Sequence, residues 1–89
     1  MKGNEIFVGK KPLMSYVLAV VTQFSESNGE VIVKARGRSI NLAVDIVQIV
    51  KNKFAKDAKI TSVKLGTDEV ERKEGGKMNI SSIEIVLKK

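Results

Sequence analysis

The sequence contains no cysteine and no histidine among its 89 residues. Without cysteine, the chain can form no disulfide and offers no thiolate to a metal ion. Without histidine, it lacks the commonest metal ligand and the commonest general base. We therefore predict no metal and no other cofactor, and an enzymatic reaction would have to rest on Asp, Glu, Lys, Ser or Tyr16.

Aromatic residues and long apolar runs are also scarce. One tyrosine and three phenylalanines provide little material for binding single strands by base stacking, and Tyr16 is either a core residue or a stacking platform. No apolar run approaches the roughly 20 residues that a membrane span requires, and the N-terminus lacks the apolar core of a secretory signal. We expect a soluble, cytoplasmic protein, and its Lys- and Glu-rich composition is typical of thermophiles.

Positive charge is in excess. Sixteen Lys and Arg residues outnumber ten Asp and Glu residues, for a formal net charge of +6. This balance favours a polyanion such as nucleic acid, or an anionic membrane surface. No helix has the apolar face flanked by lysines that membrane-surface binding uses, so no membrane partner is expected. The length fits one domain, residues 1–89, that buries roughly 60 to 65% of its unfolded surface.

The apolar patterns occur in the order β-α-β-α-β-β. Strands are predicted at 5–9, at 30–35 and on both sides of Gly75 and Gly76, and helices at 12–28 and 40–54. Pro12 suits a first helical turn, and Ser39 is a plausible N-cap for the second helix. Right-handed crossovers and a final antiparallel hairpin give a two-layer α/β sandwich, with both helices on one face of a mixed four-stranded sheet.

The final hairpin is predicted to project as an arm over about residues 66–80. Val70 is the only aliphatic residue between positions 68 and 77, so this segment cannot bury much surface. Four acidic residues oppose three basic ones there: Asp68, Glu69, Glu71 and Glu74 against Arg72, Lys73 and Lys77. Two interpretations stay open: the three cations reach a nucleic-acid groove while the acids face solvent, or the whole hairpin is solvated.

The second helix has an apolar arc of roughly 220°, wider than packing on one sheet requires. One stripe covers the sheet and contains Ile40, Ala43, Val47, Val50 and Phe54. The adjoining stripe contains Leu42, Ile46 and Ile49. We expect this second stripe to form a dimer interface, because twofold dimers are the commonest oligomers. The alternative is that the final hairpin folds over it.

Two basic loops follow the first two strands. The loop "GKKP" contains Lys10 and Lys11, and the loop "KARGRS" contains Lys34, Arg36 and Arg38. The carboxyl ends of parallel strands meet at one edge of a sheet, so we predict that both loops lie together at two helix N-termini. Glycines in both loops would let backbone N–H groups approach a phosphate closely. The alternative for each single cation is a solvated surface residue.

Three segments together resemble the Alba family of archaeal chromatin proteins: "VGKKPLMSYVLAV", "VIVKARGRSINLAVDIVQIVKNKF" and "SSIEIVLKK". The resemblance covers essentially the whole chain. It implies a fold similar to the C-terminal domain of bacterial translation initiation factor three. It also implies a dimer, with a second copy or a paralogue, that binds double-stranded DNA, and RNA as well, with little sequence preference. Such a protein would coat and compact DNA in the archaeal nucleoid.

The resemblance also implies roles for single residues. Lys10 and Lys11 would contact the nucleic acid, and acetylation of Lys10 would weaken binding, with an acetyltransferase and a deacetylase as further partners. Arg36 and Arg38 would contribute to the same surface, and the hairpin would reach along the minor groove. Phe54 would take part in contacts between neighbouring dimers, whereas helical periodicity alone favours a place in the core.

Two other functions stay open. A primarily RNA-directed role, as a ribonucleoprotein subunit or an RNA stabiliser, would use the same surface. An enzyme or sensor could hold a small phosphorylated ligand at the two helix N-termini, but no acid or base stands out beside that site. Asp45 and Glu84 fall on a polar helix face and an outward strand face. We predict binding without a reaction. If both "GKKP" lysines and both "KARGR" arginines meet phosphates, a dimer would give a log-log salt slope of roughly minus seven.

Overall fold

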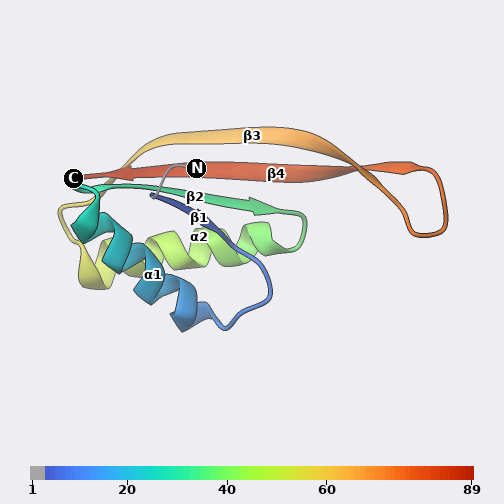
Figure 1. The fold of residues 1–89 in the computed structure, drawn as a ribbon. Coiled ribbons are helices and arrows are strands. Elements are labelled where there is room, and N and C mark those ends of the chain that lie inside the picture. The colour runs from blue at the N-terminus through green and yellow to red at the C-terminus, as the bar shows by residue number, and fades with distance from the viewer. Residues whose placement is uncertain (1–3) are drawn as a thin grey trace.

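A four-stranded sheet with two helices on one of its faces forms the body of the molecule in the computed structural model, which describes residues 4–89 (Figure 1). In chain order the elements are β1 (Glu5–Phe7), α1 (Leu13–Glu26), β2 (Glu30–Arg36), α2 (Ser39–Ile49), the π-helical turn η1 (Val50–Phe54), β3 (Lys59–Glu71) and β4 (Lys77–Lys88). The predicted β-α-β-α-β-β order and two-layer α/β fold are confirmed. Within residues 4–89, no helix is both long and apolar enough to cross a membrane.

The strands lie in the order β1-β2-β4-β3. β1 pairs with β2 in parallel, whereas β4 runs antiparallel to both β2 and β3, so the sheet is mixed. β3 therefore runs in the same direction as β2, with β4 between them. The last strand takes this inner position because its alternating apolar residues bury a full row of side chains: Ile83, Ile85 and Leu87.

The core lies between the sheet and the helices, the two layers seen in Figure 1. β2 alternates in the same way as β4, and it buries Val31, Val33 and Ala35. α1 contributes Tyr16, Val17, Val20 and Phe24, and the second helical segment contributes Ala43, Ile46, Val47 and Val50. No polar or charged side chain is buried within residues 4–89, so burial of apolar surface is the main force that holds the layers together.

The start and the burial pattern of α2 differ from the prediction. The helix begins at Ser39, Arg38 takes the cap position, and no side chain caps the helix, so Ser39 is not the N-cap. Ile46 is completely buried inside its own protomer, because it lies one turn before Val50 on the face that meets the sheet. Its assignment to a dimer interface was wrong, and only Leu42 and Ile49 of that stripe stay partly exposed.

The π-helical turn η1 explains a second difference. The Ala55 N–H donates to the Val50 carbonyl at 2.7 Å, an i to i+5 bond that widens the turn. Residues after Val50 are therefore rotated out of phase with α2. Phe54 leaves the core stripe in which helical periodicity placed it, and its side chain is 49% exposed.

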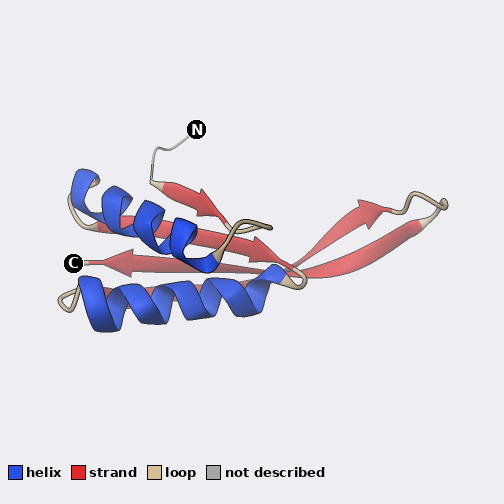
Figure 2. Cartoon of the chain, turned by 90° about the horizontal axis from the view of Figure 1, so that it is seen from below, coloured by secondary structure: helices blue, strands red, loops and turns tan. Residues whose placement is uncertain are grey.

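The hairpin of β3 and β4 continues beyond the body as a two-stranded arm (Figures 1 and 2). Pairing runs out to Glu71 opposite Lys77. At the tip the Arg72 N–H donates to the Gly76 carbonyl at 3.0 Å, and Gly75 and Gly76 take positive φ angles of 96° and 85°. The hairpin does not fold over the outer stripe of α2. It lengthens the molecule to 45 × 23 × 22 Å.

Candidate nucleic-acid interface

The two basic loops lie at the same end of the sheet, beside the point where the arm leaves the body (Figures 1 and 2). This placement follows from the parallel pairing of β1 and β2, whose carboxyl ends share one edge. The Val8 N–H donates to the Lys34 carbonyl at 2.9 Å and so extends the contact one residue past β1. The fold thus brings the loop that contains Lys10 next to the turn that contains Arg38.

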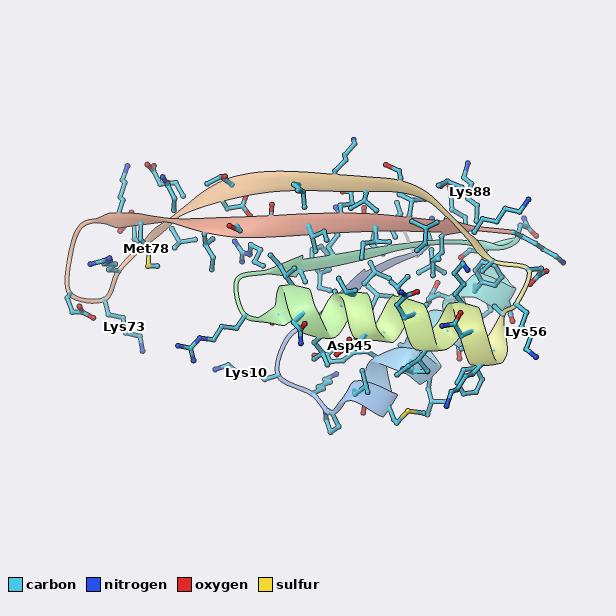
Figure 3. The ribbon with its side chains drawn as sticks, turned by 180° about the vertical axis from the view of Figure 1, so that it is seen from behind. Lys10, Asp45, Lys56, Lys73, Met78 and Lys88 are labelled. Carbon is cyan, nitrogen blue, oxygen red and sulfur yellow. The ribbon has the colours of Figure 1, made fainter. Side chains whose placement is uncertain are left out.

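Three cations at this end have no acidic partner among the residues that the structure describes. Lys10, Lys11 and Arg38 are exposed, and none of them forms an ion pair within residues 4–89. The Lys10 side chain extends away from the body, on the side of the molecule where the arm carries Lys73 (Figure 3). These charges are therefore available to an external anion.

The Tyr16 hydroxyl is hydrogen-bonded to the backbone of the loop that contains Lys10 and Lys11. It accepts hydrogen bonds from the Gly9 N–H at 2.8 Å and the Lys11 N–H at 3.0 Å. Side chains on a helix lean toward its N-terminus, which brings this hydroxyl under the loop that precedes α1. Because both amides point inward and are already satisfied, a close approach of this loop's backbone to a phosphate would not use the Gly9 or Lys11 N–H.

The Gly37 backbone is also engaged in contacts within the protein. Its φ is 56°, its N–H donates to the Ser81 carbonyl at 2.8 Å, and an added Cβ would lie 2.8 Å from the Ile80 side chain. Glycine is needed here because the turn packs against the root of the arm. The second loop therefore presents its side chains, rather than this amide, to a ligand.

Lys34 does not join the free cations. Strand alternation turns it to the helix-free face of the sheet, where its Nζ lies 3.3 Å from Glu5, 3.6 Å from Glu84 and 5.5 Å from the centre of the Phe7 ring. The hydrogen bond to Glu5, and then the charges of both carboxylates, raise the pKa of Lys34 above its usual value. With two carboxylates beside it, Lys34 is a poor candidate for phosphate contact.

The remaining predicted cations differ in whether an acidic side chain lies beside them. Arg36 Nη1 lies 3.6 Å from Asp68, and Lys77 Nζ lies 3.5 Å from Glu69, all with exposed side chains. Arg72 and Lys73 are exposed at the tip of the arm and have no acidic partner in the part of the chain that the structure describes. The arm therefore offers two free cations and one that is paired.

Sequence reasoning missed a second basic cluster at the opposite end of the molecule. It consists of Lys51, Lys53, Lys56 and Lys59, and Figure 3 shows Lys56 at the end far from Lys10. The signal was present, because four lysines fall within nine residues of the segment "KNKFAKDAK".

An uncovered apolar strip on β3 was missed as well. Val63 and Leu65 pair with Ile85 and Ile83 of β4, so they lie on the face of the sheet that the helices cover. Their side chains are nevertheless 53% and 79% exposed, and Ile60 on the same strand is also exposed. The apolar core is therefore open at the β3 edge.

The chain is thus a small, basic α/β protein with one group of exposed cations at the loop end of its sheet and a second basic cluster at the opposite end. The family model described as Alba matches residues 4–67, and the chain belongs to the Alba family. It is 51% identical over 86 residues to the DNA/RNA-binding protein Alba of Methanocella arvoryzae, a match that covers 97% of this chain and 90% of that one. It is 54% identical to the protein of the same name from Thermoplasma acidophilum, over 94% of this chain and 93% of that one.

Solved structures agree with this assignment. Alba from Thermoplasma volcanium superposes with a TM-score of 0.91 at 50% identity, covering 97% of this chain and all of that one. ALBA1 from Trypanosoma brucei superposes with a TM-score of 0.75 at 22% identity, over the whole of this chain and 71% of that one. The second match concerns the fold alone.

Proposed function

We propose that this protein is an architectural DNA-binding protein that coats and compacts duplex DNA as a dimer, and that it also binds RNA. The observation that carries the proposal is the placement of Lys10, Lys11 and Arg38 at one end of the sheet, exposed and without acidic partners within residues 4–89. Cations in this arrangement neutralise phosphates and release counterions, which gives affinity without base recognition. The names of relatives at about half identity, DNA/RNA-binding protein Alba, support the same class of ligand.

The arm extends the proposed contact beyond the body. Arg72 and Lys73 at its tip would follow the minor groove, where basic side chains bind with little sequence preference. The acidic residues of the arm limit its net charge, so we assign most of the affinity to the loops of the body and a guiding role to the arm.

A twofold dimer is part of the proposal, and the exposed strip of β3 supports it. Val63 and Leu65 continue the buried rows of β4 but lack cover in the protomer. Leu42 and Ile49 on α2 are likewise only partly buried. A second copy would cover these surfaces with matching apolar ones and would add a second set of basic loops.

RNA would use the same side chains, because its phosphates carry the same charge. A primarily RNA-directed role is therefore the second candidate. The names of the relatives, which include RNA as well as DNA, support it. Sequencing of nucleic acid crosslinked to the protein in its native cells separates the two: chromosomal fragments support the architectural role, and a predominance of transcripts supports the RNA role.

Lys10 is also the proposed acetylation site. Acetylation would remove a charge from an exposed side chain of the interface and would weaken binding. Peptide mass spectrometry of protein from its native cells tests this proposal, and a Lys10 that is never modified would remove it.

The binding surface is tested by titrating a DNA duplex at several salt concentrations with the wild type and with K10A/K11A. Three free cations in each protomer of a dimer give a log-log slope of about minus five, and a fourth contact from Arg36 would bring it to about minus seven. Because K10A/K11A removes four contacts from the dimer, its slope should be shallower by about three to four.

K56A/K59A is the matched control. It also removes two exposed lysines, but from the opposite end of the molecule, where β3 begins opposite Lys88 (Figure 3). Its slope should stay close to that of the wild type. An unchanged slope in K10A/K11A, or equal losses in both variants, would contradict the assigned surface.

A further inference from the structure

The Tyr16 hydroxyl accepts two hydrogen bonds from the backbone of the loop that contains Lys10 and Lys11. Neither the packing of the core nor the exposed charges account for these bonds. We propose that Tyr16 is a positioning residue for the nucleic-acid interface, because its hydroxyl fixes the loop from which Lys10 and Lys11 project. This inference rests on the proposed function. It adds that a group that is buried and does not itself contact the ligand sets the affinity of the exposed lysines.

The geometry places this hydroxyl at the centre of the loop. It accepts from the Gly9 N–H at 2.8 Å and from the Lys11 N–H at 3.0 Å, so the two amides on either side of Lys10 are held from one point. Residues 9 and 11 are thereby turned inward together. The side chain of Lys10, between them, extends outward (Figure 3).

Both ends of the loop are anchored in addition. The Val8 N–H donates to the Lys34 carbonyl at 2.9 Å, and the Ser15 N–H donates to the Pro12 carbonyl at 3.0 Å. Pro12 has a fixed φ and no N–H of its own. Among the hydrogen bonds of residues 4–89, those to Tyr16 are the ones that hold the segment between these anchors.

The ring and the hydroxyl of Tyr16 serve separable purposes. The ring is buried among the apolar residues of the core, a role that phenylalanine would fill equally well. The hydroxyl supplies the acceptor for two amides that water would otherwise have to satisfy. A loop ordered before binding loses less conformational freedom when a phosphate arrives, so the lysines bind more tightly than they would from a mobile loop.

The test is a double-mutant cycle on duplex affinity with the wild type, Y16F, K10A/K11A and Y16F/K10A/K11A. We expect Y16F to weaken binding by about tenfold, since it frees one loop in each protomer of the dimer. In the K10A/K11A background the same change should have no further effect, because the side chains that the loop positions are gone.

Hydrogen exchange reports on the loop directly. In the free wild-type protein the amides of Gly9 and Lys11 should exchange at least tenfold more slowly than the amide of Lys10, and in Y16F this difference should disappear. If Y16F fails to fold, the wild-type measurement still decides: equal rates at the three amides would overturn the proposal.

V20A is the control for a loss of stability alone. Val20 is completely buried on the same helix, one turn after Tyr16, and its aliphatic side chain has no group that could bond the loop amides. V20A should lower the melting temperature but leave duplex affinity and exchange at Gly9 and Lys11 unchanged. Weakening of binding by V20A as large as that by Y16F would overturn the positioning role.

The same measurements distinguish a wrong binding surface from a wrong role for Tyr16. If K10A/K11A binds duplex like the wild type, the proposed surface itself is wrong, and the role of Tyr16 falls with it. If K10A/K11A loses affinity while Y16F does not, or if Y16F weakens both backgrounds equally, the surface stands and the positioning role is overturned.

Discussion

Each cation near the two basic loops is either free or held by a carboxylate, and this local pairing decides which charges can meet a phosphate. Lys34 lies between Glu5 and Glu84 and is engaged on both sides. Arg36 has a single partner, Asp68, at 3.6 Å, and both side chains are well exposed. An exposed pair of this kind contributes only about 0 to 1 kcal/mol, so an incoming phosphate can replace the carboxylate.

Asp68→Asn should therefore strengthen duplex binding. Once freed, Arg36 would add one phosphate contact in each protomer, so affinity should rise by up to about fivefold for each protomer that contacts the duplex. If the wild type keeps this pair when bound, the salt slope of the dimer should also steepen by about two. Fluorescence anisotropy titrations at several salt concentrations measure both quantities.

Glu71→Gln is the control for charge alone. It removes the same charge from the same strand, and Glu71 forms no ion pair within residues 4–89. It should raise affinity less than Asp68→Asn and leave the slope unchanged. Equal effects of the two variants would show that Arg36 is not held back by Asp68.

At the scale of elements, the π-helical turn η1 has the largest consequence. The spacing of the apolar residues predicts Phe54 on the core face of an α-helical continuation of α2. The chain instead forms the i to i+5 bond from Ala55 to Val50, and the ring is half exposed in a lysine-rich stretch of the sequence. An exposed ring at the end of a helix suits a contact between neighbouring dimers, the role that the family resemblance implies.

Phe54→Ala should reduce cooperativity rather than intrinsic affinity. Because the ring is 49% exposed, its loss should destabilise the fold by only about 1 kcal/mol. The Hill coefficient for coating a long duplex should fall toward one, while binding to a duplex that holds a single dimer stays unchanged. Phe7→Ala is the matched control, since Phe7 is exposed on a different element. Equal cooperativity in the wild type and Phe54→Ala would exclude the proposed contact.

At the scale of the whole molecule, the sheet is wider than the layer of helices that covers it. α1 and α2 cover one face over β1, β2 and β4, but the apolar residues of β3 on that face stay exposed. An exposed apolar strip beside a core indicates a surface that is covered in an assembly. The protomer is therefore best understood as half of a proposed twofold particle with two arms and two pairs of basic loops.

Leu65→Asp should separate the dimer. Leu65 is 79% exposed in the protomer, so the fold should survive, whereas a carboxylate in an apolar interface would lack a partner. Light scattering coupled to size exclusion should give the mass of one chain, and the salt slope should fall to about half. Leu18→Asp, at an exposed leucine on α1, should stay dimeric. A dimeric Leu65→Asp would place the interface elsewhere.

The sequence by itself determined the order of elements, both basic loops and their common edge. These features depend on local periodicity, on turn residues and on the rule that parallel strands share their carboxyl ends. The family followed from three segments read together. Each of these properties is encoded within a few residues or in the order of elements, so it needs no knowledge of distant contacts.

Only the tertiary structure decided which residues are free to act. It buried Ile46, released Phe54 through a π turn, paired Lys34 with two carboxylates and turned the Gly9 and Gly37 amides inward. These outcomes depend on partners that are distant in sequence or on one irregular hydrogen bond. Helical or strand periodicity assigns a residue to a face, but contacts in three dimensions determine what meets that face.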